Sequence, residues 1–133
     1  MSSRRPLPPG FELDDDPGRV DVDAVHDFLS TSAYWALGRP REVVERSIRE
    51  ATRVVGLYRD GRQVGFARVV SDRIAFAFLN DVYVLPDLQG MGLGGALVRE
   101  AIEGSDLRGM RWLLHTADAH GLYRRFGFAE PSD

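Results

Sequence analysis

Four glycines within six residues form the part of the sequence best suited to chemistry. They lie in the segment Gln89–Gly95, which reads QGMGLGG. A strand-like segment, Phe78–Leu85, precedes this loop, and the spacing of apolar residues predicts a helix over Leu93–Glu103. The first N–H groups of a helix have no intrahelical partner, and glycines let a phosphate approach them closely. The segment therefore predicts an anion site; the alternative is a tight turn without a ligand.

Two common nucleotide motifs fit this loop poorly. Gly90, Gly92 and Gly95 match G-x-G-x-x-G, but a dinucleotide-binding domain carries that motif after its first strand and needs further strand–helix units. Here the motif begins about two-thirds along a chain of 133 residues. A nucleoside-triphosphate loop needs Gly-Lys-Ser/Thr. This chain cannot supply that motif, because all 17 of its Lys and Arg residues are Arg.

The motifs resemble those of a known family. Gln89–Gly94 resembles the acyl-CoA loop Q/R-x-x-G-x-G/A of the GCN5-related N-acetyltransferases (GNAT), and Val82–Pro86 is similar to that family's V-x-P lead-in. A second block, Thr116–Phe128, resembles the closing A-x-x-L-Y-x-x-x-G-F segment. Two blocks in the right order are more specific than either alone. The resemblance extends more loosely over residues 11–130.

The resemblance implies an N-acetyltransferase. It would move an acetyl group from acetyl-CoA, its cosubstrate, to a primary amine of a small molecule or a peptide by direct attack. A non-catalytic CoA-binding sensor or interaction module with the same fold is the alternative. The implied cofactor-binding residues form a pyrophosphate loop, a strand whose backbone holds the pantetheine arm, and a small residue beside that arm: Gln89, Gly90, Met91, Gly92, Leu93, Gly94 and Gly95; Val82, Tyr83 and Val84; and Ala119.

Two residues are candidates for proton transfer. Breaking a thioester releases a thiolate, and the resemblance implies that the Tyr123 phenol protonates it as general acid; a packing Tyr is the alternative. Asp81 lies between apolar neighbours in the predicted central strand. Burial disfavours a charged carboxylate, which suits a general base for an ammonium nucleophile. The alternative for Asp81 is a structural carboxylate that pairs with an Arg or caps a loop.

Three residues are candidates for the acceptor side. Tyr34 and Trp35 are adjacent aromatics between two predicted helices, where the family's first-helix connection overhangs the acceptor cleft. Their alternative role is core packing or the edge of a lid. Arg68 falls between apolar neighbours of a predicted strand and could contact an acidic group in the substrate cleft. Its alternative role is a charge on a solvated strand face.

The pattern of elements predicts an α/β (α+β) fold. Helices are expected over residues 20–29, from Pro40 onward, over residues 93–103 and over residues 118–125; strands are expected over residues 53–59, 63–71, 74–85 and 111–116. Asp60-Gly61 predicts a hairpin between the first two of these strands. The resemblance adds a GNAT-like mixed, mostly antiparallel sheet flanked by helices, with a splayed parallel strand pair at the CoA site.

Composition limits the other possibilities. We expect a flexible leader at residues 1–10 and a single acyl-CoA N-acyltransferase domain at residues 11–133. A net charge of −3 does not favour nucleic-acid binding, and no apolar run reaches the length of a membrane span, so we expect a cytoplasmic protein. The chain has no Cys and no helical His spacing for zinc, so we expect no metal and no acyl-cysteine intermediate. A homodimer that covers the sheet edge is an open possibility.

Overall fold

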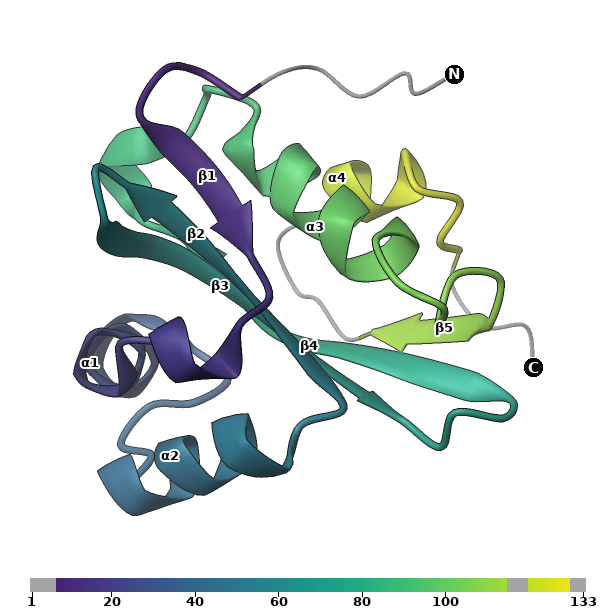
Figure 1. Ribbon diagram of the computed structural model, residues 1–133, viewed down its shortest axis with the longest axis horizontal. Coiled ribbons are helices and arrows are strands. Elements are labelled where there is room, and N and C mark those ends of the chain that lie inside the picture. Colours follow the sequence, from purple (N-terminus) through teal and green to yellow (C-terminus); the bar gives the residue numbers. More distant parts are fainter. Residues whose placement is uncertain (1–6, 115–119, 130–133) are drawn as a thin grey trace.

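The protein folds around one five-stranded sheet. The computed structural model describes residues 7–114 and 120–129. The strands lie side by side in the order of the sequence, antiparallel except for the last pair, β4 and β5 (Figure 1). They are β1 (Phe11–Asp14), β2 (Arg53–Arg59), β3 (Arg62–Ser71), β4 (Phe76–Val84) and β5 (Arg111–Leu114). This confirms the mixed, mostly antiparallel sheet with one parallel pair.

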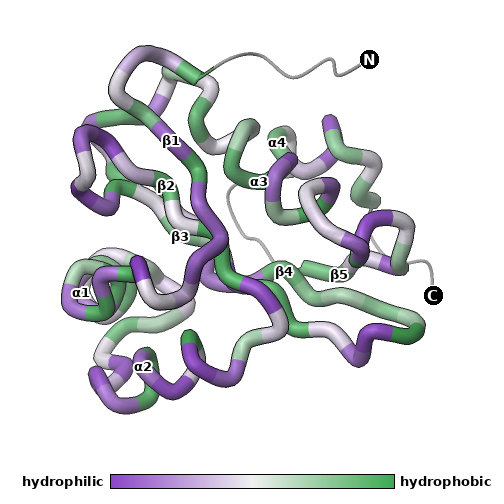
Figure 2. Tube along the Cα trace, in the orientation of Figure 1, coloured by the Kyte–Doolittle hydropathy of each residue, from purple (hydrophilic) through white to green (hydrophobic). Residues whose placement is uncertain are grey.

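Helices cover both faces of the sheet. On one face lie α1 (Val22–Ser32) and α2 (Arg41–Glu50), and on the other lie α3 (Leu93–Glu103) and the short α4 (His120–Arg124) (Figure 1). Two short 3-10 turns, Pro17–Arg19 and Pro86–Leu88, complete the described elements. Much of the surface of α2 is hydrophilic, and its buried residues are Val44 and Ile48 (Figure 2). In the described part of the chain, no helix has the length and apolar character that a membrane crossing requires.

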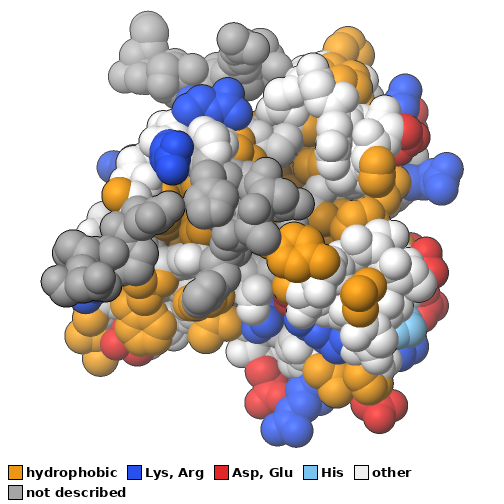
Figure 3. All heavy atoms as spheres, turned by 180° about the vertical axis from the view of Figure 1, so that it is seen from behind, with side chains coloured by type: hydrophobic (Ala, Val, Ile, Leu, Met, Phe, Trp, Pro, Cys, Tyr) orange, Lys and Arg blue, Asp and Glu red, His pale blue; other side chains and the backbone are white. Residues whose placement is uncertain are grey.

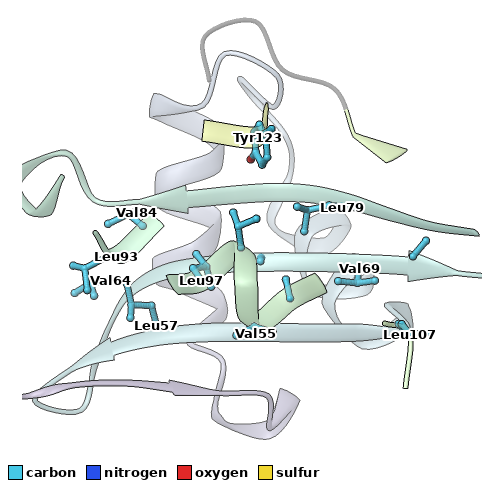
Figure 4. Close-up of a cluster of buried hydrophobic side chains, with 14 of the residues drawn as sticks. Val55, Leu57, Val64, Val69, Leu79, Val84, Leu93, Leu97, Leu107 and Tyr123 are labelled. Atoms are coloured by element: carbon cyan, nitrogen blue, oxygen red, sulfur yellow. The ribbon is translucent and has the colours of Figure 1, made fainter. Parts of the chain in front are cut away.

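The sheet separates two hydrophobic clusters. The larger lies between the sheet and α3, and includes Leu57, Leu79 and Leu97 (Figure 4). The second lies between the sheet and α1 with α2, and includes Leu29, Phe66 and Tyr83. Of the leader expected at residues 1–10, residues 1–6 lie outside the described part, and Leu7 packs against the larger cluster.

Local signals explain where the elements begin and turn. The Asp21 side chain accepts a hydrogen bond from the Ala24 N–H (3.1 Å) and caps α1, which starts two residues later than expected and continues to Ser32. The helix predicted over Leu93–Glu103 is confirmed at both ends. Asp60 and Gly61 have φ angles of 49° and 83°, as a two-residue hairpin between β2 and β3 requires.

An extra residue in β4 interrupts its pairing with β3. Phe66 pairs with Tyr83 and Arg68 with Asn80, so one residue of β3 faces two of β4, and Asp81 has a φ of 53°. Such a bulge breaks the alternation of side chains along a strand. A strict period of two along the strand predicted over residues 74–85 would place Ala77, Leu79, Asp81 and Tyr83 on one face, and the bulge prevents this. Ala77 and Leu79 face α3, whereas Tyr83 packs in the cluster on the α1 side.

Gly65 occupies the point where β3 passes closest to its neighbours. A Cβ built there would lie 2.9 Å from the Tyr83 carbonyl oxygen and 3.1 Å from the Leu57 side chain. A glycine within a strand is typical of such a close approach.

The tight turn before β4 gives a pH-dependent contribution to stability. Asp72 Oδ1 accepts hydrogen bonds from the N–H groups of Ala75 (2.9 Å), Ile74 (3.0 Å) and Phe76 (3.2 Å), which lower the pKa of the Asp72 carboxyl. A pKa that is lower in the folded state contributes stability above the unfolded pKa, and this contribution is lost as pH falls through the folded pKa. We expect Asp72→Asn to lower the free energy of unfolding at pH 7, with a deficit that shrinks below about pH 4.

Urea unfolding of both proteins between pH 7 and pH 3 measures this difference. Asp106→Asn is the matched control, because Asp106 is exposed and its side chain makes no hydrogen bond in the described part of the chain. A deficit for Asp72→Asn that is constant with pH would contradict the assignment.

Candidate active site

Part of the edge of β4 has no partner strand among the described residues. The described parallel ladder joins Phe76–Leu79 to Arg111–Leu114, and no described residue of β5 pairs with Asp81–Val84. Gln89 ties the following loop to this stretch through a long hydrogen bond from its Nε2 to the Val84 carbonyl oxygen (3.4 Å). Strand edges present N–H and C=O groups that can pair with an extended ligand. The predicted arm-binding residues therefore lie on a strand segment without a described β5 partner.

The glycine loop leads directly into the start of α3. Gly90 and Gly92 have φ angles of 90° and 78°, which glycine adopts without strain. No side chain caps α3, and its first turn has no acidic residue. A Cβ built on Gly95 meets no atom within 4 Å, so the protein's own packing does not require a glycine there. A bound phosphate fits this helix start. The first N–H groups of α3 can donate to it, the helix dipole makes this end positive, and the glycines leave space for it beside the backbone.

Tyr123 lies at the same edge of the sheet. In Figure 4 it lies beyond β4, on the side away from β2 and β3, and its side chain is mostly buried in the larger cluster. Its ring packs edge-on against Phe128, with 6.0 Å between the ring centroids. A Cβ on Gly94 would lie 3.9 Å from Leu122 Cδ2, which places α4 against the start of α3. The predicted acid and the predicted phosphate loop are thus neighbours; Ala119 lies outside the described residues.

The bulge distributes the three predicted arm-binding residues of β4 between the two faces. Val82 is partly buried against the larger cluster, and Val84 is buried within it. Tyr83 points to the other face, where its ring stacks on Phe28 with 4.0 Å between centroids, and burial raises the pKa of its phenol. Tyr83 can therefore contribute only its backbone groups to a site that holds the pantetheine arm at the strand edge.

Asp81 is held by three donors on the α1–α2 side of the sheet. Its Oδ1 accepts from Trp35 Nε1 (2.9 Å), and its Oδ2 accepts from Arg68 Nε (2.9 Å) and Arg39 Nη1 (3.0 Å). Its side chain is 1% exposed, and among the described residues it is the one charged residue that is buried. Two guanidiniums and an indole N–H satisfy the carboxylate, as the structural alternative for Asp81 requires.

The structure also places the predicted acceptor-side residues. Trp35 and Tyr34 lie in the connection between α1 and α2 and pack edge-to-face, with 5.1 Å between ring centroids. Both remain substantially exposed while Trp35 reaches Asp81. Trp35, Arg68 and Asp81 therefore form one cluster. In the view from behind, basic, acidic and apolar side chains mingle on the surface formed by α1, α2 and their connection (Figure 3).

The sequence interpretation missed Arg39. The helix expected from Pro40 onward gives Arg39 no role, but Arg39 is the second guanidinium on Asp81. A carboxylate predicted to be buried in a central strand needs cationic or N–H partners, and that requirement was the available signal. Among the residues that the structure describes, no group of three or more His, Cys, Asp or Glu side chains could hold a metal ion.

The sheet with its parallel pair β4–β5 and the glycine loop before α3 have the arrangement that the resemblance to the GNAT family predicts. The family model of the acetyltransferase (GNAT) domain matches residues 50–130. A solved structure from Xanthomonas campestris pv. campestris, assigned to the GNAT family, matches with a TM-score of 0.88 and 41% identity, and the match covers 95% of this chain and 88% of that one. A Gibberella zeae protein named as an acetyltransferase is 31% identical over 131 residues, which covers 81% of this chain and 72% of that protein.

A further relative is the peptidyl-lysine N-acetyltransferase YjaB of Salmonella typhimurium. It is 31% identical over 110 residues, which covers 83% of this chain and 70% of that protein. The chain belongs to the GNAT family, as its two motifs predict, and is an acetyl-CoA-dependent N-acetyltransferase.

Proposed function

We propose that this protein acetylates a primary amine of a small molecule or a peptide by direct attack of the amine on acetyl-CoA. The observation that carries the proposal is that the glycine start of α3, the part of β4 without a described β5 partner and Tyr123 meet at one edge of the sheet. The peptidyl-lysine relative favours an amine acceptor, and its chemistry extends to a lysine side chain in a peptide.

In this proposal each group of residues has one role. The N–H groups at the start of α3, with the glycine loop, bind the pyrophosphate of CoA. The backbone of Val82–Val84 holds the pantetheine arm as an added strand and directs an N–H toward the thioester carbonyl. The amine nitrogen forms a bond to that carbonyl carbon as the C–S bond breaks. Tyr123 gives its proton to the departing sulfur, and water takes the proton that the nitrogen loses.

The absence of Cys favours direct attack over an acyl-enzyme route through a thiolate. A panel of primary amines with detection of released thiol tests the function. We expect turnover on at least one amine, with a rate that depends on both substrates. CoA binding without turnover on any amine would support the non-catalytic sensor instead.

Asp81 has two proposed roles that a single substitution separates. As a structural residue it joins β4, Arg68 of β3 and the α1–α2 connection, and Asp81→Asn would leave two partly buried guanidiniums without their carboxylate. Breaking a buried pair costs about 3–5 kcal/mol. Because both guanidiniums retain some exposure, we expect a loss of about 1–3 kcal/mol in the free energy of unfolding.

Urea unfolding and the pH profile of kcat/KM decide between these roles. The structural role predicts lower stability and a pH profile of unchanged shape. A general base predicts, in addition to that loss of stability, a loss of kcat/KM that varies with pH. Asp27→Asn on the exposed surface of α1 is the control for removal of a carboxylate charge.

A further inference from the structure

The cluster around Asp81 carries more positive charge than the protein neutralises. Arg39 and Arg68 share one carboxylate, that of Asp81, so the cluster has a net charge of +1. The guanidiniums are largely removed from water, since their side chains are 20% and 15% exposed. One Arg would be enough to neutralise Asp81. A second one, partly desolvated and uncompensated, is unfavourable unless an anion completes the cluster.

Most of the N–H groups of both guanidiniums remain available to a ligand. Asp81 uses Nη1 of Arg39 and Nε of Arg68, and neither side chain donates to another acceptor among the described residues. A guanidinium carries five N–H donors in a planar fork that matches a carboxylate. Asp81 also fixes the orientation of both side chains, so an incoming carboxylate meets donors that are already positioned.

Arg68 faces open space as well as Asp81. It lines a hollow of about 620 Å³ whose other walls come from α2. Two of the three carboxylates of α2 in that hollow are paired with other Arg residues: Glu45 pairs with Arg41 and Arg49, and Glu50 pairs with Arg46. Glu42 is exposed and has no ion pair in the described part of the chain. The hollow therefore offers a small molecule access to the guanidinium of Arg68.

We propose that Arg68 and Arg39 bind a carboxylate of the acceptor, so that the preferred acceptors are amino acids or other small amines with a carboxylate a few bonds from the nitrogen. This inference rests on the proposed function. Arg68 lies opposite Asn80, and Asp81 directly precedes the β4 segment proposed to hold the pantetheine arm. A carboxylate bound at Arg68 places a nearby amine at that segment. The exposed ring faces of Trp35 and Tyr34 can contact an apolar side chain of the same acceptor.

The test compares acceptors that differ only in the carboxylate. The panel contains amino acids with aromatic, aliphatic and acidic side chains, their carboxamides and the corresponding decarboxylated amines, with thiol release as the readout. For the wild-type protein we expect kcat/KM to be at least tenfold higher for an amino acid than for its carboxamide, because charge-assisted hydrogen bonds would be lost.

Arg68→Met removes the guanidinium and keeps an apolar stem, and it leaves Asp81 paired with Arg39. We expect this variant to lose at least tenfold in kcat/KM on amino acids, mainly through KM, and to change less than about threefold on decarboxylated amines. Arg62→Met, at the exposed start of β3, makes the same change in net charge and should leave both values unaltered. Equal losses on both acceptor types, or a wild-type preference for amines without a carboxylate, would overturn the proposal.

A binding measurement separates this inference from the proposed function. If CoA binds but no acceptor turns over, the proposed function fails, and calorimetry with N-acetyl-L-phenylalanine and N-acetylphenethylamine on the CoA-bound protein then tests the site. A carboxylate site is supported if N-acetyl-L-phenylalanine binds saturably, N-acetylphenethylamine does not bind, and the Arg68→Met substitution abolishes the binding. No binding of N-acetyl-L-phenylalanine, or equal binding of both compounds, overturns it.

Discussion

Tyr123→Phe is expected to lower kcat by at least tenfold and to leave the affinity for CoA nearly unchanged. The substitution keeps the ring that packs against Phe128 and removes only the hydroxyl. General acid–base catalysis typically contributes about 10²–10⁴-fold, and water can replace part of that contribution at an open strand edge. Steady-state kinetics on the first amine found to turn over gives kcat, and calorimetry gives the affinity for CoA.

Tyr58→Phe provides the matched control. The Tyr58 hydroxyl is buried on β2 without a hydrogen-bond partner among the described residues, and burial raises the pKa of that phenol to about 12. Removal of an unsatisfied hydroxyl should leave kcat unchanged and should not reduce stability. A packing role for Tyr123 predicts that both variants keep kcat within about twofold of the wild-type value, and this result would remove Tyr123 from the mechanism.

Gly92→Asp is expected to weaken CoA binding by at least about a hundredfold. Gly92 precedes α3 with a φ of 78°, and a Cβ built on it would meet no atom within 4 Å. A carboxylate there would lie close to the pyrophosphate, and like charges about 4 Å apart repel by about 1–4 kcal/mol per pair at effective dielectric constants between 80 and 20. Asp tolerates left-handed backbone better than most residues and favours a helix start, so the fold should be retained.

Gly92→Asn separates the effect of the added negative charge on CoA binding from the effect of the added side chain. Asn has nearly the same size and a similar tolerance of positive φ, but it has no charge. We expect it to bind CoA at least tenfold more tightly than Gly92→Asp, with a similar melting temperature. If calorimetry shows wild-type affinity for the Asp variant, the pyrophosphate site is not at the start of α3.

The sequence predicted the regular parts of the fold because their signals are local. The apolar spacing of Leu93–Glu103 and the Asp60-Gly61 turn each depend on a few neighbouring residues, and both are confirmed. The two motif blocks also predicted the family and the parallel strand pair. The exposed connection that carries Tyr34 and Trp35 was correctly placed between two helices.

The features that the sequence did not predict depend on distant contacts. The bulge at Asp81 is a property of the pairing of β4 with β3, and a period of two along β4 alone cannot reveal it. The second guanidinium on Asp81 comes from Arg39, 42 residues earlier in the chain. Of the candidate site, the positions along the chain were therefore predictable, and the grouping of Asp81 with Arg39, Arg68 and Trp35 was not.

The order of the strands has a consequence for how the protein folds. From β1 to β4, each strand lies beside the strand that precedes it in the sequence, and β2, β3 and β4 are joined by short turns. Such local pairings close small loops and form early, whereas β5 joins β4 only after the chain has crossed through α3. The pairs β4–β5 and β1–β2 are therefore the two non-local contacts of the sheet, since β1 joins β2 only after the chain has passed through α1 and α2. The meander of β2, β3 and β4 can form first, and the proposed CoA-binding edge of β4 is complete only when the later contact with β5 has formed.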